Sequence, residues 1–273
     1  MANYLKRHLH NTRKHLWKGK PMAELTTNLP RSGGRNNLGR MTARKVGPGA
    51  QRRRYRWIDF YRDNEGSTAK VVRLEYDPNR TAYIALLQYE DDTYSYMIAP
   101  ENLKVGDVVR EGPSSVRNIG DTMKIADIPM GQMIHNVELY PGDGGRIARA
   151  AGTFVRLCGK EGGFGILQLP SGERRMVSDQ CRATIGVVSN EAHRHDNLGK
   201  AGTNRRKGIR PIVRGIARNP VDHPMGGRTN SKHPRSPTGK YAKGGFTRQR
   251  NKRSDKMIIK RAGSSKYKSP MGK

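Results

Sequence analysis

Short stretches of alternating apolar and polar residues run through the middle of the chain and predict β-strands. Between residues 57 and 128 the candidate strands are 57–62, 69–76, 81–88, 93–99 and a shorter one at 105–108. In the second of these, the apolar side chains would face one side of a sheet and the charged ones the other. The apolar face would hold Val72, Leu74 and Tyr76, and the opposite face Arg73 and Glu75. Several short strands at this spacing predict a small barrel, and a five-stranded OB-like barrel fits the length.

The same kind of sequence continues to residue 190. Short apolar runs occur at 133–139, 153–157, 163–169, 174–177 and 184–188, separated by glycine and proline. Five short strands predict a second small barrel, SH3-like in size. We expect the boundary between the barrels near Pro129-Met130-Gly131, and one short helix around residues 191–197.

The two ends of the chain lack this periodicity. Glycine, proline and asparagine recur there and interrupt helices and strands. The predicted fold class is therefore mainly β, an OB-like barrel followed by an SH3-like barrel, flanked by long basic irregular extensions. The predicted domains are a basic N-terminal arm (1–56), the OB-like barrel (57–130), the SH3-like barrel (131–197) and a Gly/Pro-rich C-terminal extension (198–273). No apolar run reaches the 18 or so residues of a membrane span.

Charge is distributed very unevenly along the chain. The formal net charge is +30 and the pI is about 10.7. Residues 1–56 hold 15 Lys and Arg against one acid (+14), and residues 191–273 hold 23 against four (+19). Residues 57–190 hold 15 against 18 (−3), an ordinary composition for a folded domain. Arms with so much like charge repel themselves, so we expect a phosphate-rich partner, RNA, to neutralise and order them.

The residue types in the arms suit RNA. Arginine pairs with phosphate through two parallel hydrogen bonds, lysine supplies a point charge, and glycine lets the backbone approach closely. The predicted RNA-binding residues are Arg35, Arg40, Arg44, Arg52, Arg53, Arg54, Arg56, Lys200, Arg205, Arg206, Lys207, Arg210, Arg214, Arg218, Asp222, His223, Arg228, Lys232, Lys240, Lys243, Arg248, Arg250, Lys252 and Arg253. Tyr55, Trp57, Tyr241 and Phe246 could stack on unpaired bases, although packing in the barrel explains Tyr55 and Trp57 equally well.

No catalytic or metal site is expected. Asp222 could orient His223 for acid–base chemistry, but the arm lacks the fold to hold a nucleophile and a pocket. A turn fixed by Asp222, with His223 touching RNA, is the preferred interpretation. Cys158 and Cys181 have no CxxC partners and are expected to be buried free thiols. His8 and His10, within a basic arm, would contact phosphate. We therefore expect no cofactor of the protein's own, and Mg²⁺ only as a counterion of the RNA.

Three segments of the C-terminal extension are highly specific. They are Leu198-Gly199-Lys200-Ala201-Gly202, Gly208-Ile209-Arg210-Pro211-Ile212-Val213-Arg214-Gly215 and Asn219-Pro220-Val221-Asp222-His223-Pro224-Met225-Gly226-Gly227. The chain closely resembles the universal family of large-subunit ribosomal protein two, in its bacterial and organellar form, over about residues 35–261. The resemblance implies two barrels, with extensions that thread into large-subunit rRNA near the subunit interface and the peptidyl-transferase region. It also implies support of subunit joining, tRNA placement and assembly. The implied partners are rRNA, neighbouring ribosomal proteins, the small subunit at the interface and, indirectly, tRNA.

The sequence departs from the family in the same extension. Met225 stands where the family usually has a second histidine, and Thr238 stands where it has tryptophan. The usual glycine-rich run is shortened, so that Gly226-Gly227 passes directly to Arg228. Such changes fit an organellar lineage. Together with the absence of a cleaved leader before Met1, they favour a mitochondrial ribosome and the mitochondrial matrix, with the bacterial cytoplasm or a plastid as alternatives.

Two other function classes compete with a ribosomal role. A nuclease or RNA-modifying enzyme would need clustered acids or a cofactor loop, and the acids of the middle region are scattered at turns and strand ends. A free RNA chaperone or translation factor would share the basic composition. Sedimentation distinguishes these classes, since a ribosomal protein stays with the large subunit in high salt and a factor dissociates.

Overall fold

The computed structural model describes residues 15–47, 53–62, 64–113, 117–227, 233–244, 248–249 and 251–263. They divide into two units. The first, which we call the β body, holds the described residues of 15–29, 53–197 and 254–263. The second, which we call the basic unit, holds the described residues of 30–52 and 198–253.

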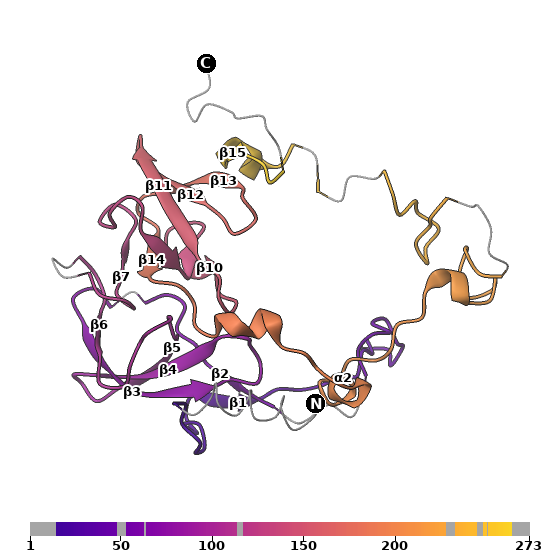
Figure 1. Ribbon diagram of the computed structural model, residues 1–273, viewed down its shortest axis with the longest axis horizontal. Coiled ribbons are helices and arrows are strands. Elements are labelled where there is room, and N and C mark those ends of the chain that lie inside the picture. Colours follow the sequence, from indigo (N-terminus) through magenta and orange to yellow (C-terminus); the bar gives the residue numbers. More distant parts are fainter. Residues whose placement is uncertain are drawn as a thin grey trace. The chain divides into compact units, whose positions relative to one another are not determined.

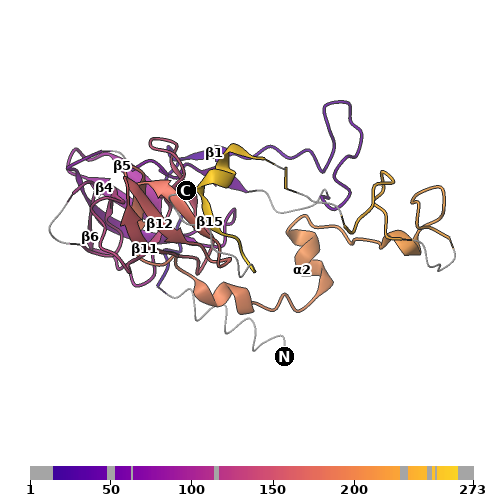
Figure 2. The same ribbon diagram turned by 90° about the horizontal axis from the view of Figure 1, so that it is seen from above.

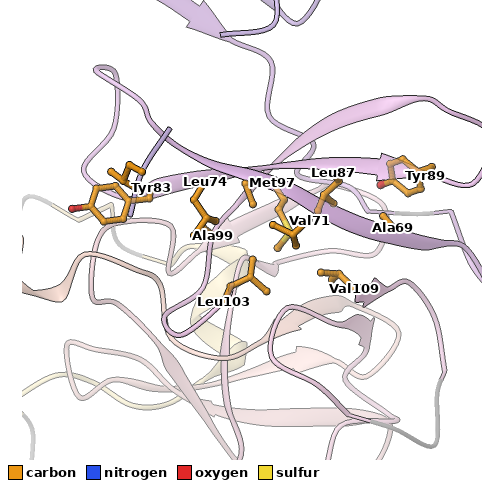
Figure 3. Close-up of a cluster of buried hydrophobic side chains, with 12 residues drawn as sticks. Ala69, Val71, Leu74, Tyr83, Leu87, Tyr89, Met97, Ala99, Leu103 and Val109 are labelled. Carbon is orange, nitrogen blue, oxygen red and sulfur yellow. The ribbon is translucent and has the colours of Figure 1, made fainter. Parts of the chain in front are cut away.

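A four-stranded antiparallel sheet forms the first part of the β body, in the order β5-β4-β3-β6 (Figure 1). Its strands are β3 (Thr68–Tyr76), β4 (Tyr83–Tyr89), β5 (Tyr94–Ile98) and β6 (Val108–Arg110). Strand β4 has both faces covered, which explains its nearly continuous apolar sequence. One face packs into a cluster that includes Val71, Leu87 and Met97 above Leu103 and Val109 (Figure 3). The other face packs with Tyr96, Ile98 and Val188.

The predicted alternation in this sheet is broken within β3. The pairing of β3 with β4 shifts register between Val71 and Arg73, which marks a β-bulge. A bulge adds one residue to one strand and reverses the faces beyond it. Val71 and Leu74 therefore share one buried cluster, whereas Val72 packs against the cluster on the other face. Tyr76, at the end of the strand, is exposed. The prediction that Val72, Leu74 and Tyr76 form one apolar face is wrong for this reason.

The second sheet of the β body has seven strands, in the order β15-β13-β12-β11-β8-β14-β7. They are β7 (Thr122–Lys124), β8 (Met133–His135), β11 (Val155–Glu161), β12 (Phe164–Gln168), β13 (Arg174–Ser178), β14 (Arg182–Ile185) and β15 (Ile258–Lys260). Strand β7 precedes the boundary predicted near residue 130, yet it pairs with β14. Strand β15, which the sequence pattern did not indicate, pairs with β13 at the edge of the sheet (Figure 1), and Figure 2 shows β15 from above. It is held there by the buried side chains of Ile258 and Ile259.

Two short ladders complete the strands of the β body. Strand β1 (Thr26–Asn28) pairs with β2 (Arg54–Arg56), and β9 (Val137–Glu138) with β10 (Gly145–Ile147). The strand predicted at 57–62 is reduced to a single bridge between Ile58 and Tyr96. The chain turns there because the Asp59 carboxylate accepts hydrogen bonds from the backbone N–H groups of Tyr61 and Arg62, at 2.9 and 3.1 Å. The short helix predicted after residue 190 is confirmed as the 3-10 helix η1 (Glu191–His195).

A buried polar network supports the four-stranded sheet. The Arg62 guanidinium donates from Nε to Glu111 Oε1 at 2.6 Å, and both side chains are about 1% exposed. The same carboxylate oxygen accepts from the Tyr89 hydroxyl at 2.7 Å, and the other accepts from the backbone N–H of Asn64 at 3.1 Å. Burial raises the pKa of Tyr89 to about 12, so the phenol stays a donor. Glu111 is thus a buried charge with several donors, as such a group requires.

The mainly β fold class is confirmed. Strand pairing produces open sheets, and no closed barrel is found among the described residues. Cys181 is buried as expected, but Cys158 is exposed on β11, because it points away from the core cluster that holds Leu157. None of the helices in the described ranges has the length and apolar character needed to cross a bilayer.

The basic unit is organised very differently. Its helices are α2 (Ala201–Arg206) and the 3-10 helix η2 (Gly215–Ala217), and a third, η3 (Arg253–Met257), begins at its last residue. None of its described apolar side chains is buried, and its buried residues are Gly34, Gly47 and His223. Backbone hydrogen bonds and close glycine contacts hold it together, as the loops below show.

Candidate nucleic-acid interface

A compact loop between Gly34 and Ala43 presents the cations of the first arm. Gly34 has a φ of +82°, and its carbonyl accepts the backbone N–H groups of Thr42 and Ala43 at 3.0 and 3.1 Å. A Cβ at this position would lie 2.4 Å from the Ala43 carbonyl oxygen, so the loop requires glycine. The Asn36 side chain closes the turn by accepting the N–H groups of Leu38 and Arg40. The backbone thus fixes the loop while its arginines stay exposed.

The two arms meet in the basic unit although more than 150 residues separate them in sequence. Val46 and Ile209 form an antiparallel bridge. The backbone N–H of Arg210 donates to the Lys45 carbonyl, and that of Gly47 to the Gly208 carbonyl, both at 2.9 Å. Just before this bridge, α2 ends in Arg205, Arg206 and Lys207, which are all exposed. Cations at a helix C-terminus are favoured by the helix dipole.

The loop around His223 is built on the imidazole itself. The ring is 7% exposed and lies against Gly215, where a Cβ would come within 2.5 Å of His223 Cε1. His223 Nδ1 accepts the backbone N–H of Met225 at 3.1 Å, which ties the ring to the loop backbone. The backbone N–H of Gly227 donates to the Arg218 carbonyl at 2.9 Å and closes the loop. His223 is therefore the internal support of a turn, and the Asp222 carboxylate beside it is exposed.

A second hairpin in the basic unit joins Arg235 to Tyr241. The Arg235 guanidinium lies 4.5 Å from the Tyr241 ring centroid and donates to its hydroxyl at 3.2 Å. His233 packs edge-on against the same ring, with centroids 4.9 Å apart. Thr238, which replaces the family's tryptophan, contacts the Ser236 hydroxyl at 2.9 Å. Tyr241 remains 61% exposed, which leaves a ring face for a stacking partner.

The predicted RNA-binding residues are mostly exposed. Arg35, Arg40, Arg44, Arg54, Lys200, Arg205, Arg206, Lys207, Arg214, Asp222, Lys240, Lys243, Arg248, Lys252 and Arg253 are exposed, and Arg53, Arg210 and Arg218 are half-buried. His223 and Arg56 are buried, and Arg56 pairs with Asp77 at 3.6 Å within the β body. Arg52, Arg228, Lys232 and Arg250 lie outside the described residues, as do His8, His10 and Phe246.

Sequence reasoning missed a basic and aromatic patch on the β body. Arg149 Cζ lies 4.5 Å from the Phe60 ring centroid, and Arg80 Cζ lies 5.7 Å from it. Arg80 is paired with Asp77 at 2.7 Å. Arg149, in contrast, has no carboxylate among the described residues within ion-pair range, and burial together with the charge of Arg80 lowers its pKa. This crowding of positive charge favours an added anion.

The missed patch had one usable signal in the sequence. Arg80 lies between the strands predicted at 69–76 and 81–88, next to the turn residues Asp77-Pro78-Asn79. The charge count instead directed attention to the arms, because the middle region is slightly acidic overall.

Tyr55 and Trp57, the two aromatic residues predicted either to stack on bases or to pack in the barrel, lie near one another. Their ring centroids are 5.6 Å apart, and Trp57 is 59% exposed. Stacking therefore remains available to Trp57.

Comparison with known proteins identifies the family. Ribosomal Proteins L2, RNA binding N-terminal domain, matches residues 22–111, and Ribosomal Proteins L2, C-terminal domain, matches residues 118–241. Large ribosomal subunit protein uL2 of Paracoccus denitrificans is 51% identical over 252 residues, covering 91% of this chain and 90% of the relative. The protein of the same name from Rhodospirillum centenum is 53% identical over 254 residues, covering 91% and 92%.

A third relative, Large ribosomal subunit protein uL2 of Bartonella tribocorum, is 52% identical over 252 residues, covering 91% of this chain and 90% of its own. All three relatives are bacterial proteins, so they give no support to the mitochondrial origin predicted from the sequence. Identity of this level over nine-tenths of both chains leaves no doubt about kinship. The chain belongs to the ribosomal protein L2 family of the large ribosomal subunit, in its bacterial form.

Proposed function

We propose that this chain is a structural protein of the large ribosomal subunit that binds large-subunit rRNA near the peptidyl-transferase region. There it supports assembly, subunit association and tRNA placement. The observation that carries the proposal is the basic unit, in which residues 30–52 and 198–253 contain 22 Lys and Arg and one acid. A unit of this charge has no apolar core among its described residues, so its ordering depends on a polyanion. Neighbouring ribosomal proteins and the small subunit are further proposed partners, with tRNA contacted indirectly.

The chain itself is not proposed as an enzyme. A general base needs an available nitrogen that can approach the proton to be removed. His223 Nδ1 already accepts the Met225 N–H, and the ring is buried against Gly215. His223 thus supports the loop that rRNA contacts, and its role is positional. No cofactor is proposed beyond Mg²⁺ that accompanies the RNA as a counterion.

The salt dependence of rRNA binding tests the proposal. Each phosphate contact contributes roughly 0.7–0.9 to the slope of log K against log salt. Replacing the exposed Arg205, Arg206, Lys207 and Arg214 with Gln should lower the magnitude of that slope by about 3. A matched variant with Lys70, Lys104, Arg117 and Arg156 replaced by Gln removes the same charge from exposed sites on the β body. Equal slope changes in both variants would contradict a dedicated basic unit.

The β body contributes a second, smaller rRNA contact in this proposal. The Phe60–Arg80–Arg149 patch supports it, because Arg149 has no acidic partner among the described residues. Replacing Arg149 with Met should weaken binding to large-subunit rRNA about tenfold while the slope falls by about 1. Sedimentation completes the test. The protein should remain with large subunits through a high-salt wash, and complete release would favour a translation factor.

A further inference from the structure

A groove in the basic unit has a mixed lining that phosphate binding alone does not explain. It has a volume of about 1000 Å³ and is formed by Met41–Lys45 on one side and by residues 210–213 and 217–219, with Asp222 and Pro237, on the other. All of its lining residues belong to the basic unit. This volume is at the upper end of the range of small-molecule sites, roughly 300–1000 Å³. The groove is therefore large enough for a nucleotide and its neighbours.

Apolar side chains line the groove without being covered by protein. Ile212 is 72% exposed, Val213 is 52% exposed and Met41 is 39% exposed. Large apolar side chains at the edge of a strongly cationic unit do not assist phosphate binding. They suit the flat face of an unpaired base, which stacks on apolar and aromatic side chains.

Four cations surround the same groove. They are Arg44, Lys45, Arg210 and Arg218. Arg218 is held in place because its Nη2 donates to the Val213 carbonyl at 3.1 Å. The Arg210 backbone is fixed by its hydrogen bond to the Lys45 carbonyl. None of the four has a carboxylate partner among the described residues, which leaves them available to the phosphates on either side of a bound base.

Asp222 is the unexpected member of the lining. It is the only acidic residue in residues 30–52 and 198–253, among 22 Lys and Arg. Its carboxylate is exposed, and no donor among the described residues reaches it, although four cations line the same groove. A carboxylate opposes phosphate binding, so its place in the groove points to a ligand with hydrogen-bond donors. Guanine presents two adjacent donors, N1–H and the exocyclic amino group, which match the two oxygens of a carboxylate.

We propose that this groove binds one unpaired guanosine of an RNA strand. The base lies against Met41, Ile212 and Val213, and the flanking phosphates contact the four cations. Asp222 accepts both donors on the Watson–Crick edge of the base. The inference rests on the proposed RNA-binding function and adds a base preference to it. The occupant is RNA because the groove combines a strongly positive rim, a carboxylate that accepts hydrogen bonds and an exposed apolar surface.

The test uses the full chain and short fluorescent oligouridines that carry one central guanosine, inosine, adenosine or abasic site. The guanosine probe should bind about tenfold more tightly than the adenosine and abasic probes. Inosine, which lacks the amino group, should fall between them. The preference should persist as salt is raised, while affinity for every probe decreases. Salt-dependent binding that is the same for all probes would overturn the guanosine site and leave RNA binding intact. Loss of binding to every probe would instead overturn the proposed function.

Variants distinguish recognition of the base from the attraction between the cations and the phosphates. Asp222→Asn should abolish the guanosine preference, because an amide cannot accept both donors, and should change abasic binding little. If this variant strengthens binding to all probes equally, Asp222 only opposes phosphate and the site is refuted. Ile212→Ser should weaken the base-containing probes alone, whereas Ile216→Ser, an exposed control outside the groove lining, should not. A preference that disappears when Mg²⁺ is chelated would mean that Asp222 holds a hydrated cation, which would also refute the base contact.

Discussion

The β body and the basic unit are stabilised by different kinds of interaction. In the β body, carboxylates are buried beside arginines, as in the Arg62–Glu111 pair and the Arg80–Asp77 pair. Fully buried apolar side chains such as Ile84 and Leu87 fill the space between its strands. The basic unit has no buried apolar side chain among its described residues and one acid in its sequence. Its order comes from backbone hydrogen bonds, glycine contacts and the imidazole of His223.

Two parts of one chain therefore owe their ordered structure to different interactions. Apolar burial stabilises the β body without a partner, by about 25 cal/mol for each Å² removed from water. Backbone hydrogen bonds contribute only about 1 kcal/mol each, and like charges oppose the basic unit. The β body should therefore be stable alone, and the basic unit should gain stability from RNA.

The largest single effect is expected at the buried ion pair of the β body. Arg62→Met would leave the Glu111 carboxylate buried without its main partner and should lower the free energy of unfolding by about 3–5 kcal/mol. Urea denaturation followed by circular dichroism measures this change. Because the double variant Arg62→Met/Glu111→Gln removes both charges, it should recover much of the loss. A cost under about 1 kcal/mol for Arg62→Met would show that water replaces the arginine.

A matched pair of apolar truncations contrasts the two regions directly. Leu87→Ala in the covered strand β4 should cost about 2–5 kcal/mol of unfolding free energy, since the side chain is fully buried. Ile212→Ala in the basic unit should change the same quantity by less than about 0.5 kcal/mol, because Ile212 is exposed. Comparable losses from the two substitutions would mean that the basic unit has an apolar core of its own.

The buried imidazole of the β body predicts a pH effect. Burial lowers the pKa of His135 to about 4 from its ordinary value of 6.5. The unfolded chain takes up a proton as pH falls through 6.5, and the folded body does not until about pH 4. This contribution to stability is therefore complete above pH 6.5 and is lost toward pH 4, by about 3 kcal/mol in all.

His135→Gln removes this titration and keeps a polar side chain of similar size. The difference in unfolding free energy between the two proteins, measured from pH 7.5 down to pH 4, should shrink steadily as pH falls. His135 Nδ1 lies 3.0 Å from the Gly186 carbonyl, so the variant loses one internal hydrogen bond at every pH. A difference that is constant across the range would contradict a buried neutral imidazole.

The two thiols should differ in reactivity with no measurable effect on stability. Burial, with the nearby Glu138 and Asp179 charges, raises the pKa of Cys181 to about 12, whereas Cys158 is exposed. Iodoacetamide near pH 8 should modify Cys158 in the folded protein and both thiols in denaturant, as mass spectrometry would show. In the Cys158→Ser variant the folded protein should remain unmodified. Rapid labelling of Cys181 in that variant would show that the β body opens easily.

Sequence patterns were most informative where the fold depends on local alternation. They located most strands of both sheets and the helix after residue 190, and the charge count separated the arms from the middle region. The β-bulge at Val71–Arg73 was not predictable, because the extra residue is defined by pairing with β4 rather than by its own sequence. Strand β15 was missed because three residues within a basic extension carry too little periodicity, and their burial depends on the edge of β13.

The candidate interface was predicted in composition but not in geometry. The recurrent glycine of the arms indicated close backbone approach, yet only the structure shows that the arms pair with each other at Val46 and Ile209. Arg56 was grouped with the RNA-binding arginines from its basic neighbours, whereas it is buried beside Asp77. Arg149 escaped notice because its setting is created by Phe60 and Arg80, which lie far away in the sequence.

The most direct measurement is hydrogen exchange of the full chain, free and bound to large-subunit rRNA. The account predicts that amides of β3, β4, β11 and β12 are protected in both states. Amides whose bonds hold the basic unit, such as those of Ala43, Arg210 and Gly227, should exchange rapidly in the free protein and become protected only with RNA. Equal protection of both units in the free protein would contradict the claim that RNA supplies the stability of the basic unit.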